Sequence, residues 1–133
     1  MTVEDAIEQR VLTDAGIAAL IGGALTWGAR LPALPALQAS VVADPRPQHF
    51  KGPIRLRETR IQFDAWADDA AVARALREAV IVALTPAVLV GAIQFQRGFV
   101  VAVRGSGLLT REERAIDPEL SRQSIDINFW HNG

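Results

Sequence analysis

The sequence predicts an α+β fold, in which helices pack on one face of a largely antiparallel sheet of about four strands. Residues 70–84 carry apolar side chains at helical spacing, whereas residues 61–65 and 125–129 alternate apolar and polar side chains as strands do. A chain of 133 residues buries enough surface to fold without a disulfide or metal. We therefore expect one domain spanning residues 1–133.

Two short helices are predicted at the N-terminus from their end signals. Thr2 followed by Asp5 has the form of a capping box, which predicts a helix over about residues 3–12. Thr13 and Asp14 then start a second short helix, and the pair of glycines at 22–23 ends it near residue 20.

The third helix has the strongest signal in the chain. Asp68 or Asp69 caps it, and Thr85 followed by Pro86 ends it, which predicts a helix over Ala70–Leu84. Its apolar stripe at helical spacing faces the core and consists of Val72, Leu76, Ala79, Val80, Ala83 and Leu84.

Strands are predicted over residues 37–44, 54–67, 93–104 (with a bulge at Gly98) and 121–131. In the second strand, Ile54 and Leu56 fall in the opposite phase from Ile61, so its first half should project as an arm. Residues 45–53 contain three prolines, which suits a hairpin tip and not a sheet interior. One core cluster is expected from Phe63, Leu76, Val80, Ile125 and Ile127.

Composition narrows the function classes. The absence of cysteine excludes a disulfide framework, thiolate-ligated zinc and a thiol nucleophile, and it fits a reducing compartment. The net charge of −1 provides no overall field that would recruit nucleic acid or an acidic membrane. Apolar runs are too short to span a membrane, and the acidic N-terminus is unlike a signal peptide. We expect synthesis in the cytoplasm.

No catalytic, metal-binding or cofactor-binding group is predicted. His49 in the hairpin and His131 near the C-terminus are read as exposed histidines, because a metal site needs three or four ligands. Asp64 and Asp126 could meet across neighbouring strands, but ordinary surface acids are expected there. Ser106 lies between two glycines, but a nucleophile elbow needs glycines two residues on either side of the serine, where this chain has Arg104 and Leu108. The sequence therefore predicts a protein that is not an enzyme and takes no cofactor.

Surface aromatic and basic residues favour a partner interface instead. Trp66 and Trp130 each fall in the polar phase of a strand, and Trp and Arg are enriched at interface hot spots. Arg55, Arg57 and Arg60 form a basic cluster that could touch phosphate, and a solvated strand face or a surface for a protein partner suits it equally well. The predicted interface residues are His49, Phe50, Arg55, Arg57, Trp66 and Trp130.

The chain resembles the tail completion, or head-to-tail joining, proteins of long-tailed bacteriophages and gene transfer agents, which serve as tail terminators. The resemblance spans nearly the whole length, but the chain has no tyrosine and an unusually apolar segment after its second strand. The similar segments are TVEDAIEQRVLTDAGIAALIGG, RLPALPALQASVV, TRIQFDAWADDAAVARALREAVIVAL, DPEL and SRQSIDINFWH.

This resemblance implies a structural subunit of the virion neck that forms a ring, expected to be a hexamer. The ring would cap the tail tube, meet the head connector or stopper protein, and let double-stranded DNA pass without sequence-specific binding. We expect the polar segment 105–120, with its four acids, to lie near the bore or to dock on the tail tube or the connector. The alternative is a small ligand- or peptide-binding module, with Trp66 and Trp130 as a stacking platform.

Overall fold

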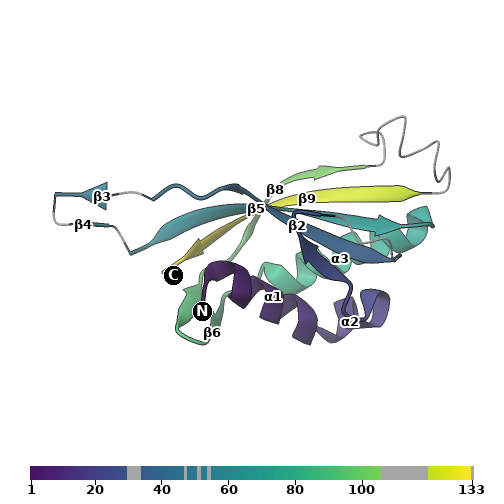
Figure 1. Cartoon of the computed structure of the whole chain (residues 1–133), viewed down its shortest axis with the longest axis horizontal. Coiled ribbons are helices and arrows are strands. Elements are labelled where there is room, and N and C mark those ends of the chain that lie inside the picture. The colour runs from purple at the N-terminus through teal and green to yellow at the C-terminus, as the bar shows by residue number, and fades with distance from the viewer. Residues whose placement is uncertain (30–33, 47, 51, 54, 106–119, 133) are drawn as a thin grey trace.

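The computed structural model describes residues 1–29, 34–46, 48–50, 52–53, 55–105 and 120–132. Three helices lie on one face of a sheet, and a narrow hairpin extends away from the body on the side opposite α2 (Figure 1). The N-terminus and the end of the last strand lie near each other. The predicted α+β class, with helices on one face, is confirmed.

The three helices begin and end where their capping residues predict. In α1 (Val3–Thr13), Thr2 and Asp5 form the reciprocal capping box. Asp14 caps α2 (Ala15–Ile21), which ends at Gly22 with a positive φ of 68°. The side chain of Asp69 accepts the amide of Ala71 at 2.8 Å at the start of α3 (Ala70–Leu84). These contacts satisfy amide groups that the first turn of a helix leaves without partners.

The main sheet has seven strands, in place of the expected four or so. Its order is β1-β2-β5-β9-β7-β6, with β8 also paired to β9, and β1 runs parallel to β2. The strands are β1 (Leu25–Trp27), β2 (Ala36–Ala43), β5 (Arg57–Ala67), β6 (Val88–Val90), β7 (Ile93–Phe95), β8 (Phe99–Arg104) and β9 (Ser121–His131). The predicted last strand is therefore confirmed at both ends.

The predicted strand over 93–104 is wrong, because the chain breaks it into β7 and β8. The amide of Gly98 donates to the carbonyl of Thr85 at 2.8 Å, which draws the chain against the end of α3. A Cβ at Gly98 would lie 3.0 Å from the carbonyl oxygen of Leu84, so glycine suits this close approach. The bulge lies farther along, between Val100 and Ala102.

The central strands β5 and β9 pair without a register shift from Arg57 to Ala67. Residues 55–56 before β5 are not in a strand, so the predicted continuous strand 54–67 is wrong, although residue 54 itself lies outside the described residues. The phase change does not occur within the paired strand. Thr59 explains the misreading, because this polar residue is fully buried on the helix-facing side. Alternation locates the buried face only where buried positions hold apolar residues.

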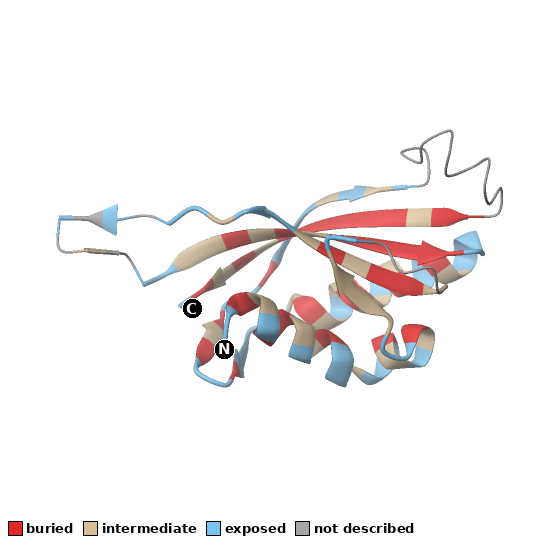
Figure 2. Ribbon diagram, viewed as in Figure 1, coloured by how far each residue is buried: buried red, intermediate tan, exposed pale blue. Residues whose placement is uncertain are grey.

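The core lies between the helices and the odd-numbered positions of β5 and β9 (Figure 2). The five predicted core residues are all fully buried in one cluster, so the core prediction is confirmed. Phe129 contacts Phe63 and Phe95 edge to face, with ring centroids 6.3 and 6.0 Å apart. Such edge-to-face pairs stabilise a core beyond the area that they bury.

The predicted arm is present as a two-stranded hairpin. Its strands are β3 (Gln48–His49) and β4 (Gly52–Pro53), which pair only with each other. Figure 1 shows the hairpin well away from the helices and the main sheet. We refer to residues 45–56 as the arm.

Candidate functional site

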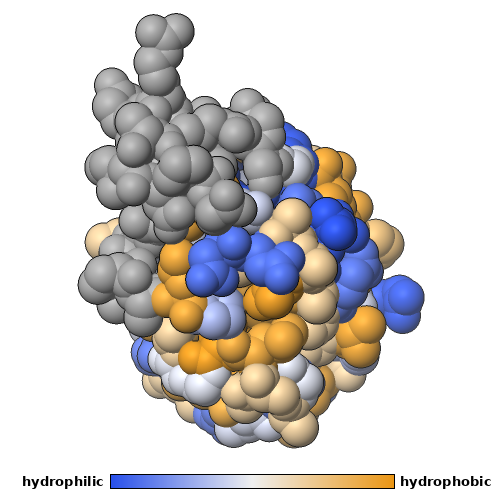
Figure 3. All heavy atoms as spheres, turned by 90° about the vertical axis from the view of Figure 1, so that its right-hand side faces the viewer, coloured by the Kyte–Doolittle hydropathy of each residue, from blue (hydrophilic) through white to orange (hydrophobic). Residues whose placement is uncertain are grey.

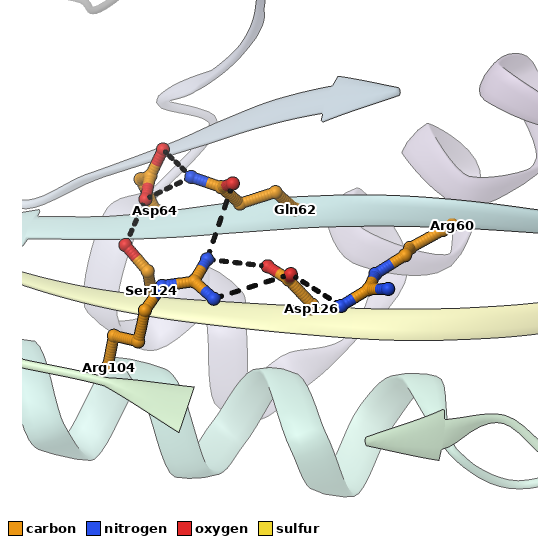
Figure 4. Close-up of polar contacts among 6 residues, drawn as sticks. All are labelled: Arg60, Gln62, Asp64, Arg104, Ser124 and Asp126. Atoms are coloured by element: carbon orange, nitrogen blue, oxygen red, sulfur yellow. Dashed lines mark hydrogen bonds and ion pairs between the residues drawn. The ribbon is translucent and has the colours of Figure 1, made fainter. Parts of the chain in front are cut away.

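A row of polar side chains crosses the face of the sheet that the helices leave uncovered (Figure 4). Asp126 on β9 accepts from Arg60 at 3.1 Å and from Arg104 at 2.9 Å. These arginines come from β5 and β8, so one carboxylate ties three strands together. Asp126 is only 4% exposed, which makes the two cations necessary to offset its desolvation.

The second acid in this row, Asp64, has neutral partners. It accepts hydrogen bonds from the amide of Gln62 at 3.2 Å and from the hydroxyl of Ser124. The carbonyl oxygen of Gln62 accepts in turn from Arg104 at 3.4 Å, which joins Asp64 to the Asp126 group. Both acids were expected at the surface, but they are buried because these long polar side chains cover them. The two acids have separate donors, and this arrangement is typical of a structural network.

Trp66 lies on the predicted face but is not exposed there. It is 4% exposed, and its indole nitrogen donates to the Gln38 side chain at 3.0 Å. The guanidinium of Arg122 lies 5.2 Å from the ring, and Leu120 packs against it. The expected exposure of this ring is therefore wrong, because residues from neighbouring strands and from the start of β9 cover it.

Trp130 lies at the other end of the same face and is half-buried. It lines a cleft of about 330 Å³ together with Pro45, Arg46 and Glu58. We call this cleft the root cleft, because Pro45 and Arg46 form the root of the arm. It places a large aromatic ring beside a carboxylate where a partner can reach both.

The two tryptophans do not form one stacking platform. Trp66 pairs with Arg122, and Trp130 pairs with Glu58. From Arg122 to Trp130 is eight residues along β9, which is about 27 Å at about 3.4 Å per residue. This separation removes the geometric support for a ligand stacked between them.

The remaining predicted interface residues lie on the arm or at its end. Phe50 is fully exposed at the hairpin turn, and Arg55 is exposed between the hairpin and β5. Arg57 is half-buried and opens β5. The backbone of His49 pairs with Gly52, whereas its side chain lies outside the described residues. Phe50 and Arg55 thus remain available for contact with another molecule.

An exposed apolar edge was missed by sequence reasoning. Strand β8 pairs with β9 only, among the described strands, and its exposed side chains are Phe99, Val100, Val101 and Val103. An unpaired apolar edge invites pairing with another chain. The run FVVAV was read as part of a longer strand, and such a run does not reveal whether its strand lies at an edge.

His131 is fully buried, which corrects its expected exposure. Its ring nitrogen Nε2 lies 2.7 Å from the hydroxyl of Thr59, and that hydroxyl lies 3.2 Å from a carboxylate oxygen of Asp44. If the hydroxyl donates its one proton to the carboxylate, Nε2 donates to the hydroxyl oxygen. The buried hydroxyl lies between the histidine and the carboxylate, so these three side chains do not have the order of a nucleophile–histidine–acid triad.

We predict that protonation of His131 lowers the stability of the folded chain in mild acid. Burial lowers the pKa of His131 from 6.5 to about 4. The positive charges of Arg57 and Arg46 lower this pKa further, whereas the negative charges of Asp44 and Glu4 raise it. Between those pH values the unfolded chain binds more protons than the folded chain. The free energy of unfolding should therefore fall by up to about 3 kcal/mol as the pH drops from 6.5 to 4.

Urea unfolding at several pH values tests this prediction, with the variant His131→Gln as the control. Glutamine keeps a hydrogen-bonding group near Thr59 but does not titrate. The wild-type chain should lose more stability than the variant across this pH window. Parallel pH profiles for the two chains would contradict the prediction.

The described residues also limit other chemistry. They contain no cluster of three or more His, Cys, Asp or Glu side chains that could hold a metal ion. None of the described helices is long and apolar enough to cross a membrane. Ser106 and the segment 106–119 lie outside the described residues.

The fold is similar to that of a chain in a solved structure titled "Virion of native gene transfer agent (GTA) particle". The TM-score is 0.68, and the match covers 98% of this chain and 95% of that chain at 19% sequence identity. The chain matches no family model, and no curated protein matches it significantly. At this identity the likeness establishes a shared fold.

Proposed function

We propose that the chain is a structural subunit of a phage or gene transfer agent particle, and specifically a tail terminator without enzymatic activity. The observation that carries this proposal is the fold match to a gene transfer agent virion chain over nearly the full length of both chains. The sequence resemblance adds the finer role, in which one domain per subunit caps the tail tube at the neck and meets the head connector or stopper protein.

The proposed assembly is a homo-oligomeric ring, and the resemblance favours a hexamer. The arm and the body of one subunit present unlike surfaces. Contacts between unlike surfaces are heterologous, and they form a closed ring when the rotation from one subunit to the next divides a full turn evenly. The end of the molecule in Figure 3 carries small hydrophobic areas separated by hydrophilic side chains, so we assign no principal contact to its described surface.

Double-stranded DNA would pass through the bore of this ring. Tight, salt-dependent DNA binding requires many basic contacts, and the net charge of −1 does not supply a strong overall attraction. Two of the basic side chains, Arg60 and Arg104, already have an anionic partner in Asp126 of the buried polar row. We place segment 105–120 near the bore or against a stacked ring, with Glu112, Glu113, Asp117 and Glu119 as its acids.

Deletion of the gene in the producing strain tests this function by electron microscopy. Without a terminator, filled heads and tail tubes should accumulate apart, and the tubes should vary in length. Expression of the wild-type chain from a plasmid should restore joined particles of uniform tail length. Normal joined particles in the deletion strain would contradict the proposal, and specific capture of a small ligand or peptide would favour a binding module.

A further inference from the structure

We propose that Phe50 at the tip of the arm inserts into the root cleft of a neighbouring copy. This inference rests on the proposed ring and names the contact that joins one subunit to the next. The occupant is a second copy of this chain, and the cleft that receives it is lined by Pro45, Arg46, Glu58 and Trp130.

The first argument is the exposure of the tip. Phe50 has a relative exposure of 111%, so its ring contacts little of its own chain. The hairpin that presents it consists of two strands of two residues each, and a two-stranded hairpin alone is marginally stable in water. A large apolar ring held out on such an element gains most by burial against another molecule.

The second argument is that the arm separates its tip from its own cleft. The pairs Gln48–Pro53 and His49–Gly52 hold the hairpin closed near Phe50. In Figure 1 this hairpin extends away from β5 and β9, whereas the root cleft is lined by residues of those strands. The tip of one copy therefore fits the cleft of another copy better than its own, and the resulting contact is heterologous.

The third argument is the fit between ring and cleft. The volume of about 330 Å³ exceeds the roughly 150 Å³ of an apolar cavity that holds benzene. Trp130 supplies an aromatic surface, and aromatic pairs prefer offset or edge-to-face contact. Trp130 and Arg46 are also of the residue types that dominate interface energetics.

The charges of the arm and of the root cleft also favour a second copy of this chain as the occupant. Residues 48–56 contain two basic residues and no acidic residue. In the root cleft, the charge of Arg46 is offset by Asp44 at 2.7 Å, whereas Glu58 has no ion-pair partner among the described residues. A basic arm thus approaches a cleft that offers an available carboxylate.

A second cleft fits less well. It has a volume of about 290 Å³ and lies where α1 meets the end of α3, beside Arg10, Pro86 and Val88. Arg10 donates to the carbonyls of Ala83 and Pro86 at 3.2 and 3.0 Å, so a cation lies at this site. Its lining includes the carboxylate of Asp14 as well as Arg10, so charge does not separate the two clefts, but no aromatic residue lines it to pack against the ring of Phe50.

Cysteine cross-linking tests the contact without background, because the chain has no cysteine. Chains with Gln48→Cys, an exposed position of the arm that leaves Phe50 in place, are mixed with chains carrying Glu58→Cys, either in assembled particles or as concentrated subunit, and treated with a short bis-maleimide. We expect a cross-linked pair of unlike chains. The matched control pairs Gln48→Cys with Val88→Cys, which tests the second cleft and should give no such product.

The outcomes separate this inference from the proposed function. Rings or joined particles that form without the Gln48–Glu58 product would overturn the inference and leave the proposed tail function unaffected. Preferential cross-linking to Val88→Cys, or an intramolecular product in a chain carrying both Gln48→Cys and Glu58→Cys, would overturn it too. Absence of the product in both particles and concentrated subunit likewise overturns it.

A substitution at the tip gives a second readout. Phe50→Ser should leave the unfolding midpoint of the free subunit unchanged, because the ring is fully exposed there. Self-association, measured by sedimentation, should weaken at least about tenfold, as expected for loss of a central aromatic anchor. Unchanged association of a folded Phe50→Ser chain would overturn the inference.

Discussion

Replacing Leu76 with alanine is expected to lower the free energy of unfolding by about 2–5 kcal/mol. Leu76 is fully buried on α3, in the cluster that contains Phe63 and Ile125. The truncation removes apolar contacts and leaves a cavity that the surrounding side chains fill only in part. The effect should appear as a lower urea midpoint with an unchanged slope.

Val82→Ala on the same helix provides the control. Val82 is 72% exposed, so its truncation should change the free energy of unfolding by no more than about 0.5 kcal/mol. A loss below about 1 kcal/mol for Leu76→Ala would mean that the buried stripe of α3 is misassigned. A similar loss for the two variants would point to the helix backbone as the cause.

The second large effect is expected from removing both cations around Asp126. In the double variant Arg60→Met with Arg104→Met, the apolar stems remain to cover the sheet, but the guanidinium groups are lost. Asp126 would then be a buried carboxylate without a charged partner. We expect a loss of about 3–5 kcal/mol in the free energy of unfolding at pH 7.

Adding Asp126→Leu to this double variant should restore part of the lost stability, because it removes the uncompensated buried charge. The pair of Arg46 and Asp44, in which the Arg46 side chain is 61% exposed, serves as the control, and Arg46→Met should cost at most about 1 kcal/mol. Urea unfolding of the four chains, wild type included, measures both comparisons. A triple variant less stable than the double variant would contradict the interpretation.

The helices and the closing strand were predictable because local chemistry determines them. Thr2, Asp14 and Asp69 each satisfy amides within a few residues of their own position. The apolar stripe of α3 and the alternation in Ser121–His131 each reflect a buried face, and the spacing of apolar residues along the sequence indicates that face directly. The short strands β1 and β6 escaped prediction because three residues carry too little alternation to be recognised.

The arm was predictable in its position on the chain, whereas the exposure of the two tryptophans was not. The prolines around residues 45–53 indicated an arm, and Phe50 is indeed exposed there. Trp66 and Trp130 have the same pattern of neighbours in sequence, yet Leu120 and Arg122 cover only the first. A residue's phase in a strand specifies its face, whereas side chains from distant segments decide how much of it water reaches.

The sequence by itself determined the fold class, the three helices, the last strand and the core cluster, because caps and periodicity act over a few residues. Only the tertiary structure decided the break between β7 and β8, the burial of Thr59 and His131, and the row of side chains around Asp126. Each of these depends on atoms far apart in the chain, such as the Gly98 amide at the end of α3. Their polar groups are buried because distant partners satisfy them, and no local pattern encodes that pairing.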